Sequence, residues 1–486
     1  MHSNYSLPDS PRIVIVGAGF SGIGVAIRLK SAGIDDFIIL EKSDRPGGTW
    51  RDNTYPGCAC DVESLLYSFS FAPNPNWSEN YASQPEILSY IEDCISKYDL
   101  SPHIHYGIEF QGSRWNDTAA HWDLQTSSGN LQTRALILGL GPLHQPSFPP
   151  LTRDAFEGES MHTSGWRHDL DLSGKRIGVI GTGASAIQVV PNIAEQAGEL
   201  YVFQRTPPWI IPRINPQFPK FVRKFFKYVP FVQRFVRTCL YWTLESRVLA
   251  FATKHSTNRI LGHAYARSHL KKQIPDPTLR KRFTPSYEIG CKRVLISSDY
   301  YPAFTRENVH LVDEAVTDIE STGLKTESSS YPLDIIIYAT GFKTTETLSE
   351  LPIEGRNGIT LAQAWGNGAS AYLGTSIHGF PNLFLVLGPN TGLGHNSMIF
   401  MIEAQADHII QALSHLDHHR SLEVKAGSER TFSERARAAT ESTVWSTGCR
   451  SWYLDEQGRN VILWPKSTVR FWLQTRRFDP SSYEIE

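Results

Sequence analysis

The sequence of 486 residues is long enough for two or three domains. Its composition, 41% hydrophobic and 20% charged, is typical of a globular protein, and 47 Lys and Arg against 49 Asp and Glu give no electrostatic reason to expect a nucleic-acid partner. The N-terminus has no signal-peptide pattern, and no apolar run approaches the roughly 18 residues that span a bilayer.

Residues 12–22, RIVIVGAGFSG, combine a short apolar strand, a glycine-rich turn and the start of a helix. The glycines of the turn are Gly17, Gly19 and Gly22. This spacing lets the backbone close on a pyrophosphate at a helix N-terminus, and Glu41, after the next strand, can accept hydrogen bonds from ribose hydroxyls. The pattern predicts a bound dinucleotide; the alternative is a glycine-rich turn with no ligand.

Residues 176–186 repeat this plan. The small residues of the second turn are Gly181, Gly183 and Ala186. Arg205 occupies the position that corresponds to Glu41, and a guanidinium attracts the ribose 2′-phosphate that a carboxylate repels. The second copy is therefore expected to prefer NADP, unless Arg205 is a surface residue with no phosphate to hold.

The six cysteines are scattered, and no two of them form a Cys-x-x-Cys pair. They are Cys58, Cys60, Cys94, Cys239, Cys291 and Cys449. This pattern argues against a zinc site and a redox dithiol, so no metal site is expected, and the reducing cytoplasm is the simplest location.

Residues 47–61, GGTWRDNTYPGCACD, form an irregular stretch where the rest of a flavin would lie. GG-x-W followed by YPG and Asp61 resembles the flavin loop of class B flavoprotein monooxygenases, in particular type I Baeyer–Villiger monooxygenases. The resemblance implies FAD in the first unit and NADPH in the second. The aromatic run at residues 65–81 reads equally as cofactor lining or as core.

Residues 156–166, FEGESMHTSGW, follow a proline-rich linker at 142–150. They match the pattern F-x-G-x-x-x-H-x-x-x-W of Baeyer–Villiger enzymes, with Trp166 where related N- and S-oxygenating enzymes carry Tyr or Phe. Arg167 departs from the family's usual Pro or Asp. Without this pattern, His162 would read as a core or surface histidine.

Residues 209–274 differ in composition from the nucleotide-binding unit before them. Within this stretch, residues 221–242 mix Arg and Lys with large apolar side chains at helical spacing. Such a basic amphipathic stretch can lie on a membrane surface. A helical insertion packed on the parent domain is the favoured interpretation, so membrane contact is not expected.

Residues 289–301, IGCKRVLISSDYY, carry two adjacent cations. The family resemblance implies that Lys292 touches the NADP 2′-phosphate and that Arg293 enters the active site; on their own they would read as solvated surface. A buried strand at 333–338 then ends in an Ala-Thr-Gly turn, which in this family marks the return to the flavin domain.

The last motifs lie near the C-terminus. Residues 383–398 read as a strand, a glycine-rich loop and a helix whose N-terminus, aimed at the flavin, would stabilise negative charge. Type I Baeyer–Villiger enzymes usually have a Ser/Pro-rich loop here. Residues 451–460 resemble a mobile stretch in which Trp452 closes over NADP.

These motifs predict an α/β fold with two dinucleotide-binding, Rossmann-like domains and the NADP domain inserted into the FAD domain. The expected boundaries are 1–145 and 331–486 for FAD and 146–330 for NADP, including the helical insertion. Further expected FAD contacts are Phe20, Ser21, Gly48, Thr49, Trp50, Asp61, Tyr67, Phe110 and Met398. Further expected NADP contacts are Thr182, Ser185, Thr206, Lys292, Arg293 and Trp452.

Two facing nucleotides imply hydride transfer from NADPH to FAD, and in a monooxygenase the reduced flavin forms a peroxide with O2. A deprotonated peroxide needs a fixed cation, so Arg293 is the expected catalytic residue, oriented by Asp61 unless Asp61 only shapes its own loop. Three functions are open: oxidation of a ketone to an ester or lactone, oxygenation of N or S atoms, and a flavin reductase or electron carrier. Trp166, Arg293 and Asp61 favour the first, with a small organic substrate and O2 as partners.

Overall fold

The computed structural model describes residues 7–8, 10–251, 257–344, 346–449, 451–455 and 457–486. Three parts of the sequence-based expectations lie outside the described residues: residues 1–6 of the N-terminus, residues 252–256 of the helical insertion, and residue 456 of the stretch expected to close over NADP.

The first sheet carries the glycine-rich turn of residues 12–22 and has five parallel strands in the order β19–β7–β1–β2–β3. They are β1 (Ile13–Val16), β2 (Phe37–Glu41), β3 (Ile104–Tyr106), β7 (Ala135–Leu138) and β19 (Leu383–Leu385). Every residue of β1, β2 and β7 is buried, as the continuous apolar runs of a parallel sheet require. Beside this sheet, α1 (Phe20–Ser31) packs against α13 (Met398–His415).

The second sheet has five parallel strands in the order β13–β10–β9–β17–β8. They are β8 (Glu159–His162), β9 (Arg176–Ile180), β10 (Glu199–Phe203), β13 (Val309–Val312) and β17 (Ile335–Tyr338). The chain thus leaves the first sheet after β7 and returns to it at β19, which gives the predicted α/β fold with one Rossmann-like unit inserted into the other. Because β17 pairs with β9 and β8, the return follows Tyr338 and not residue 330, where the sequence had placed the boundary.

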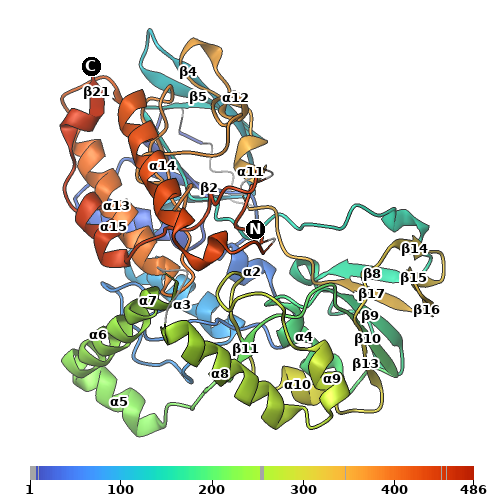
Figure 1. Ribbon diagram of the computed structural model, residues 1–486. Coiled ribbons are helices and arrows are strands. Elements are labelled where there is room, and N and C mark those ends of the chain that lie inside the picture. The colour runs from blue at the N-terminus through green and yellow to red at the C-terminus, as the bar shows by residue number, and fades with distance from the viewer. Residues whose placement is uncertain (1–6, 9, 252–256, 345, 450, 456) are drawn as a thin grey trace.

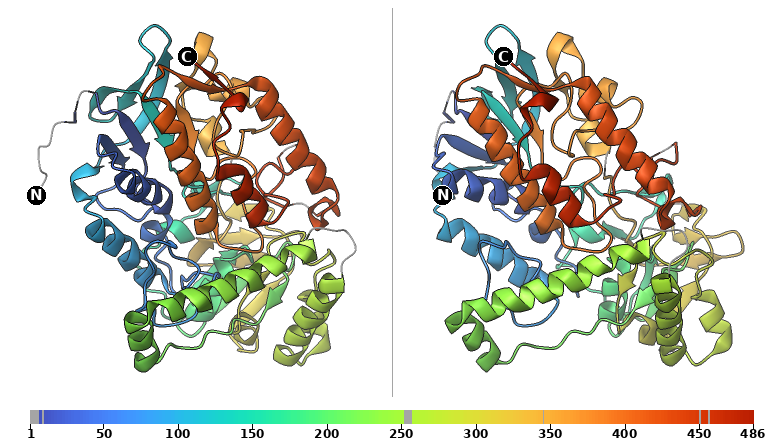
Figure 2. Two further views of the ribbon diagram at one scale, coloured as in Figure 1. Left: turned by 90° about the vertical axis from the view of Figure 1, so that its left-hand side faces the viewer. Right: turned by 60° about the vertical axis from the view of Figure 1, so that its left-hand side comes forward.

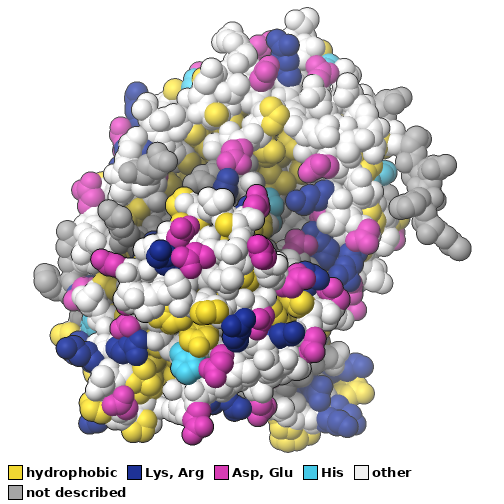
Figure 3. All heavy atoms as spheres, turned by 90° about the vertical axis from the view of Figure 1, so that its right-hand side faces the viewer, with side chains coloured by type: hydrophobic (Ala, Val, Ile, Leu, Met, Phe, Trp, Pro, Cys, Tyr) yellow, Lys and Arg dark blue, Asp and Glu magenta, His cyan; other side chains and the backbone are white. Residues whose placement is uncertain are grey.

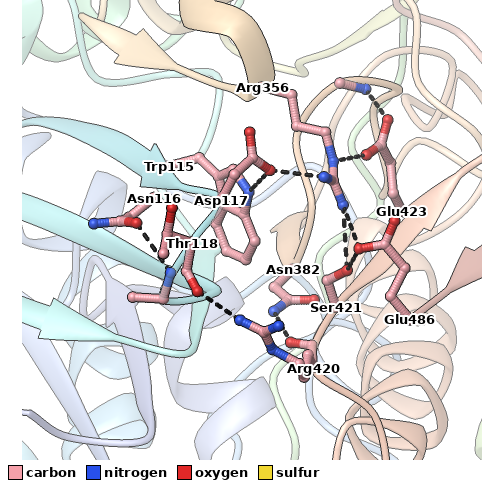
Figure 4. Close-up of polar contacts among 12 residues, drawn as sticks. Trp115, Asn116, Asp117, Thr118, Arg356, Asn382, Arg420, Ser421, Glu423 and Glu486 are labelled. Atoms are coloured by element: carbon pink, nitrogen blue, oxygen red, sulfur yellow. Dashed lines mark hydrogen bonds and ion pairs between the residues drawn. The ribbon is translucent and has the colours of Figure 1, made fainter.

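A four-stranded sheet packs on the first sheet and is tied to the C-terminus. It contains β4 (Phe110–Asn116), β5 (His121–Thr126), β6 (Gly129–Thr133) and β18 (Ile353–Glu354). Next to β18, Arg356 donates hydrogen bonds to Asp117 at 2.7 Å, to Glu423 at 2.6 Å and to the Glu486 side chain at 3.1 Å (Figure 4). One guanidinium therefore connects the small sheet to both strands of the C-terminal hairpin, β20 (Leu422–Val424) and β21 (Tyr483–Ile485).

The helices α5, α6 and α8 of the insertion lie along the lower edge of the molecule in Figures 1 and 2. The remaining helices are α2 (Thr49–Asp52), α3 (Gln84–Lys97), α4 (Ala186–Ile193), α5 (Lys220–Tyr228), α6 (Pro230–Ser246), α7 (Val248–Phe251), α8 (Thr257–Gln273), α9 (Pro277–Arg282), α10 (Tyr300–Ala303), α11 (Glu346–Ser349), α12 (Leu361–Ala364), α14 (Ala426–Glu441) and α15 (Thr468–Thr475). The remaining strands are β11 (Ile210–Ile211), β12 (Leu295–Ile296), β14 (Asp318–Glu320), β15 (Gly323–Lys325) and β16 (Ser330–Pro332). Among the helices of the described ranges, none has both the length and the apolar character needed to cross a membrane.

Candidate active site

A cavity of about 1030 Å³ lies between the two Rossmann-like units, and both glycine-rich turns line it. The carboxyl ends of β1 and β9 face this cavity, which is where doubly wound sheets bind nucleotides. All sequence-predicted site residues line it except Gly22 and Ala186. Those that line it are Gly17, Gly19, Phe20, Ser21, Glu41, Gly48, Thr49, Trp50, Asp61, Tyr67, Phe110, Gly181, Thr182, Gly183, Ser185, Arg205, Thr206, Lys292, Arg293, Met398 and Trp452.

The first glycine-rich turn has no room for a side chain at Gly17 or Gly22. Gly17 has φ +101°, and a Cβ there would lie 2.8 Å from the carbonyl oxygen of Gly139. A Cβ on Gly22 would lie 1.9 Å from the carbonyl oxygen of Gly17, so Gly22 permits α1 to pack on the turn. Because no side chain caps the N-terminus of α1 at Gly19, its backbone N–H groups remain open to an anion in the cavity. This geometry fits a pyrophosphate.

Glu41 is held at the end of β2 with its side chain on the cavity wall. Its carboxylate accepts hydrogen bonds from the backbone N–H groups of Ala18 at 2.9 Å and Ser43 at 3.0 Å. Arg51 of α2 donates a third, at 2.8 Å. Glu41 therefore joins the glycine-rich turn to the flavin-like loop, a position that also suits contact with a ribose.

The second turn is closed at Gly181 and open to the cavity at Gly183. Gly181 has φ +111°, and a Cβ there would lie 2.5 Å from the carbonyl oxygen of Ala339. A Cβ at Gly183, by contrast, would meet no protein atom within 4 Å, so a ligand can approach this backbone closely. Ala186 is fully buried at the start of α4, which explains why it does not line the cavity.

Two cations, Arg205 and Lys292, meet at the second unit's end of the cavity. Burial and the positive charge of Arg205 lower the pKa of Lys292. Within the described part of the chain, neither side chain forms an ion pair with a carboxylate, and the ammonium of Lys292 lies 5.0 Å from the ring centre of Tyr287. Two neighbouring cations without a carboxylate make a site for an anion such as a phosphate.

Asp61 and Arg293 form an ion pair on the cavity wall. The Nε of Arg293 donates to Oδ2 of Asp61 at 2.9 Å, and its Nη2 donates to Oδ1 at 2.8 Å and to Oδ2 at 2.7 Å. The charge of Asp61 raises the pKa of Arg293 above its ordinary value. The Arg293 side chain is 33% exposed and lines the cavity, so a molecule in the cavity can reach the guanidinium.

Aromatic side chains form the wall near α1. The Nε1 of Trp50 donates to the hydroxyl oxygen of Tyr67 at 3.1 Å, and the rings of Phe20 and Tyr67 meet edge to face with centres 5.3 Å apart. Burial raises the pKa of Tyr67, so its hydroxyl stays protonated. Met398 begins α13, whose N-cap residue Ser397 accepts a hydrogen bond from the N–H of Ile399. A second helix N-terminus therefore reaches the cavity.

A disulfide bond joins the segment of Arg293 to the segment of Trp452. It links Cys291 to Cys449, which are 158 positions apart. Trp452 is 46% exposed, while its neighbour Tyr453 is buried, and burial raises the pKa of Tyr453 to about 12. This bond departs from the reduced state that the scattered cysteines had suggested.

The residues of the F-x-G-x-x-x-H-x-x-x-W pattern do not line the cavity. His162 instead packs edge to face against Phe148 and Phe342, with ring centres 5.4 and 5.6 Å apart. These two phenylalanines belong to the two segments that connect the Rossmann-like units, and both line the cavity. The unusual Arg167 forms ion pairs with Glu159 and Asp169 at the surface.

Sequence reasoning missed several residues of the site. Tyr287 and the connecting residues Phe148 and Phe342 line the cavity, and Tyr453 lies beside Arg293. Tyr453 could have been predicted from the sequence, because it directly follows Trp452, which was already an expected site residue. The first connecting segment carried only its proline content, whereas Phe342 directly follows the Ala-Thr-Gly turn that had marked the return to the flavin domain.

Comparisons with known proteins agree with this geometry. Residues 14–227 match the family described as pyridine nucleotide-disulphide oxidoreductase. A Baeyer–Villiger monooxygenase of Pseudomonas aeruginosa is 44% identical over 98% of this chain and 91% of its own, and one of Streptomyces coelicolor is 40% identical over 100% and 94%. An oxidised steroid monooxygenase bound to NADP superposes with a TM-score of 0.87 at 30% identity, covering 98% of this chain and 99% of that one. OTEMO in complex with FAD and NADP gives 0.87 at 27% identity over 98% and 100%.

Proposed function

The chain belongs to the Baeyer–Villiger monooxygenases, and from this premise we propose that Arg293 and Asp61 are the pair with which it converts a ketone to an ester or a lactone. It is an NADPH- and O2-dependent flavoprotein monooxygenase with FAD and NADP as cofactors. The observation that carries the residue assignment is the Asp61–Arg293 ion pair on the wall of the cavity that both glycine-rich turns line.

When bound, NADPH supplies a hydride and FAD activates O2 for insertion beside a carbonyl carbon. We assign the first sheet to FAD, with the α1 N-terminus holding the pyrophosphate and Glu41 the ribose. Trp50 and Tyr67 support this assignment, since they are hydrogen-bonded to each other and provide aromatic side chains on the cavity wall, against which a flavin ring could pack. Thr49, Phe110 and Met398 complete the proposed FAD contacts.

The second sheet, including β17, is the proposed NADP domain. Arg205 and Lys292 would hold the 2′-phosphate, because a dianion relieves the repulsion between two cations that have no other charged partner among the described residues. Gly183 would admit the pyrophosphate, and the half-exposed Trp452 would cover the nicotinamide end.

Arg293 provides a positive charge that persists at any physiological pH. Its raised pKa and the two-pronged contact with Asp61 fix both its protonation and its direction. A guanidinium held in this way stabilises negative charge that develops on oxygen during ketone oxidation. Asp61 is the positioning residue, because it accepts hydrogen bonds from Arg293 on both carboxylate oxygens.

The test is product analysis for wild type and Arg293→Ala on a panel of ketones and thioethers. Arg293→Ala should still bind FAD and oxidise NADPH, while ester formation falls on the order of 100- to 1000-fold. Arg306→Ala, which removes an exposed arginine of the same unit, is the matched control. Normal ester formation by Arg293→Ala would contradict the assignment. Thioether oxidation without ketone oxidation by the wild type would point to a heteroatom monooxygenase, and NADPH oxidation with no oxygenated product to a reductase.

A further inference from the structure

The outer side of α5 and α6 carries a row of exposed aromatic side chains. They are Phe221, Phe225, Tyr228, Phe231, Phe235 and Trp242, each between 50% and 76% exposed. Their spacing places three of them along one face of each helix. Single exposed apolar residues are ordinary, but a contiguous set of this kind marks a contact surface. We refer to these six residues as the aromatic face.

The inner side of α6 combines apolar and polar side chains: Val232, Leu240 and Leu244 pack against the protein, and two long polar side chains bind backbone carbonyl groups. Gln233 donates to the carbonyl oxygen of Asn74 at 2.6 Å, and Arg237 donates to that of Ser68 at 3.0 Å. Glu245 is buried at the end of the helix. The insertion therefore packs on the parent domain through both polar and apolar side chains, while the six residues of the aromatic face stay outside.

The single negative charge of this region is also turned inward. Glu245 accepts hydrogen bonds from the N–H and hydroxyl of Thr468 at 2.6 and 2.7 Å and from Asn396 at 2.8 Å. Burial alone would raise the pKa of Glu245, but hydrogen bonds from these partners and from His395 lower it to about 2. Its charge is thus compensated within the protein.

The outer side of the two helices is positively charged. Residues 200–275 contain no Asp or Glu apart from Glu245. Four cations, Lys220, Lys224, Lys227 and Arg234, are exposed around the aromatic face, and none of the four forms an ion pair with any described residue. Over most of the face shown in Figure 3, Lys and Arg side chains are interspersed with Asp and Glu.

We propose that the aromatic face and its surrounding cations dock on the surface of an anionic lipid bilayer. Aromatic rings settle at the level of the lipid headgroups, and exposed Lys and Arg side chains are attracted to anionic headgroups. A second copy of the chain is the poorer occupant, because a two-fold contact through this face would bring the same cations together. The inference is independent of the catalytic assignments above.

Vesicle flotation of the full-length, FAD-loaded protein tests the proposal. Phosphatidylcholine vesicles with phosphatidylglycerol as about one third of the lipid should carry the protein upward, and pure phosphatidylcholine vesicles should carry much less. Two triple variants test the aromatic and the charged component separately. The first, Phe231→Ser with Phe235→Ser and Trp242→Ser, removes aromatic side chains. The second, Lys220→Glu with Lys224→Glu and Lys227→Glu, reverses the surrounding charges. Each should lower binding to the anionic vesicles on the order of tenfold or more.

Matched controls carry the same kinds of change on other helices. Trp472→Ser with Leu473→Ser alters exposed apolar residues of α15, and Arg430→Glu with Arg435→Glu and Arg437→Glu reverses exposed charges of α14. These controls should bind vesicles as the wild type does, and NADPH oxidation by all variants reports intact folding. The proposal is overturned if the wild type does not float with anionic vesicles, or if the controls lose as much binding. It is also overturned if the aromatic variant binds vesicles as the wild type does and differs only in its molar mass in solution. The aromatic face would then bind a second copy of the chain.

Discussion

Arg293 donates hydrogen bonds to both carboxylate oxygens of Asp61, a residue 232 positions away in the chain. Asp61 lies in the irregular loop that follows β2 of the first unit, and Arg293 lies just before β12 in the inserted part. The direction of the guanidinium therefore depends on how the inserted part sits on the first unit. A contact of this kind couples the proposed catalytic charge of Arg293 to the arrangement of the two proposed nucleotide sites.

Replacing Asp61 by Asn keeps the size of the side chain and removes its charge. Loss of one charge-assisted partner, worth about 1.5–3 kcal/mol, should lower the rate of ester formation on the order of 10- to 100-fold. Because Arg293 would then point less accurately, more NADPH should be consumed per ester formed. The measurement is the ratio of NADPH oxidised to ester produced. Asp171→Asn, at an exposed carboxylate, is the control, and an unchanged ratio in Asp61→Asn would refute the positioning role.

Arg205→Glu should shift the coenzyme preference from NADPH toward NADH. The substitution removes a cation from the proposed 2′-phosphate site and gives Lys292 a carboxylate partner. A charge-assisted contact of about 1.5–3 kcal/mol corresponds to a rise in the KM for NADPH on the order of 10- to 100-fold, with the KM for NADH unchanged or lower. Lys175→Glu, an exposed change at the opposite end of β9, serves as the control. Equal effects on both coenzymes would exclude a phosphate contact by Arg205.

Removing the disulfide should loosen the segment that carries Trp452. The Cys291–Cys449 bond connects this segment to the one that carries Lys292 and Arg293. The double variant Cys291→Ser/Cys449→Ser should lose about 2–4 kcal/mol in free energy of unfolding, because the unfolded chain is no longer cross-linked, and its KM for NADPH should rise. A dithiol reductant should lower the melting temperature of the wild type but not of this variant.

The comparison for the disulfide is Cys239→Ser, which alters an exposed free thiol. It should leave the melting temperature and its response to the reductant as in the wild type. If the reductant leaves the wild-type melting temperature unchanged, the bond does not contribute to stability.

The two nucleotide units could be predicted from the sequence because the residues that define each unit lie close together in the chain. Strand, glycine-rich turn and helix follow one another directly, and the requirement for glycine at Gly17 and Gly181 is a property of single turns. The same holds for Glu41 and Arg205, each at the end of the second strand of its unit. The Asp61–Arg293 pair is not local, and only the resemblance to a family related the two residues.

Other features depended on contacts that spacing does not reveal. The apolar run of β17 would suit either sheet, and pairing with β9 decided its place. In α6 the helical period identified apolar positions, but spacing does not reveal that Gln233 and Arg237 bind backbone carbonyl groups of the parent domain while Phe231 and Phe235 are exposed. Cys291 and Cys449 are too distant in sequence for their pairing to be read from spacing.

Acidification should destabilise the protein, with His408 of α13 as one cause. Burial lowers the pKa of His408 to about 4 from its ordinary 6.5, and its Nε2 lies 3.1 Å from the Tyr483 hydroxyl. The unfolded chain therefore binds more protons between these values, so the free energy of unfolding falls as the pH drops through this window, by about 2 kcal/mol at pH 5. Comparing melting temperatures at pH 7 and pH 5, His408→Gln should show a smaller drop than the wild type, whereas the exposed His418→Gln should show the same drop. An equal drop in all three proteins would show that His408 is not a source of the acid sensitivity.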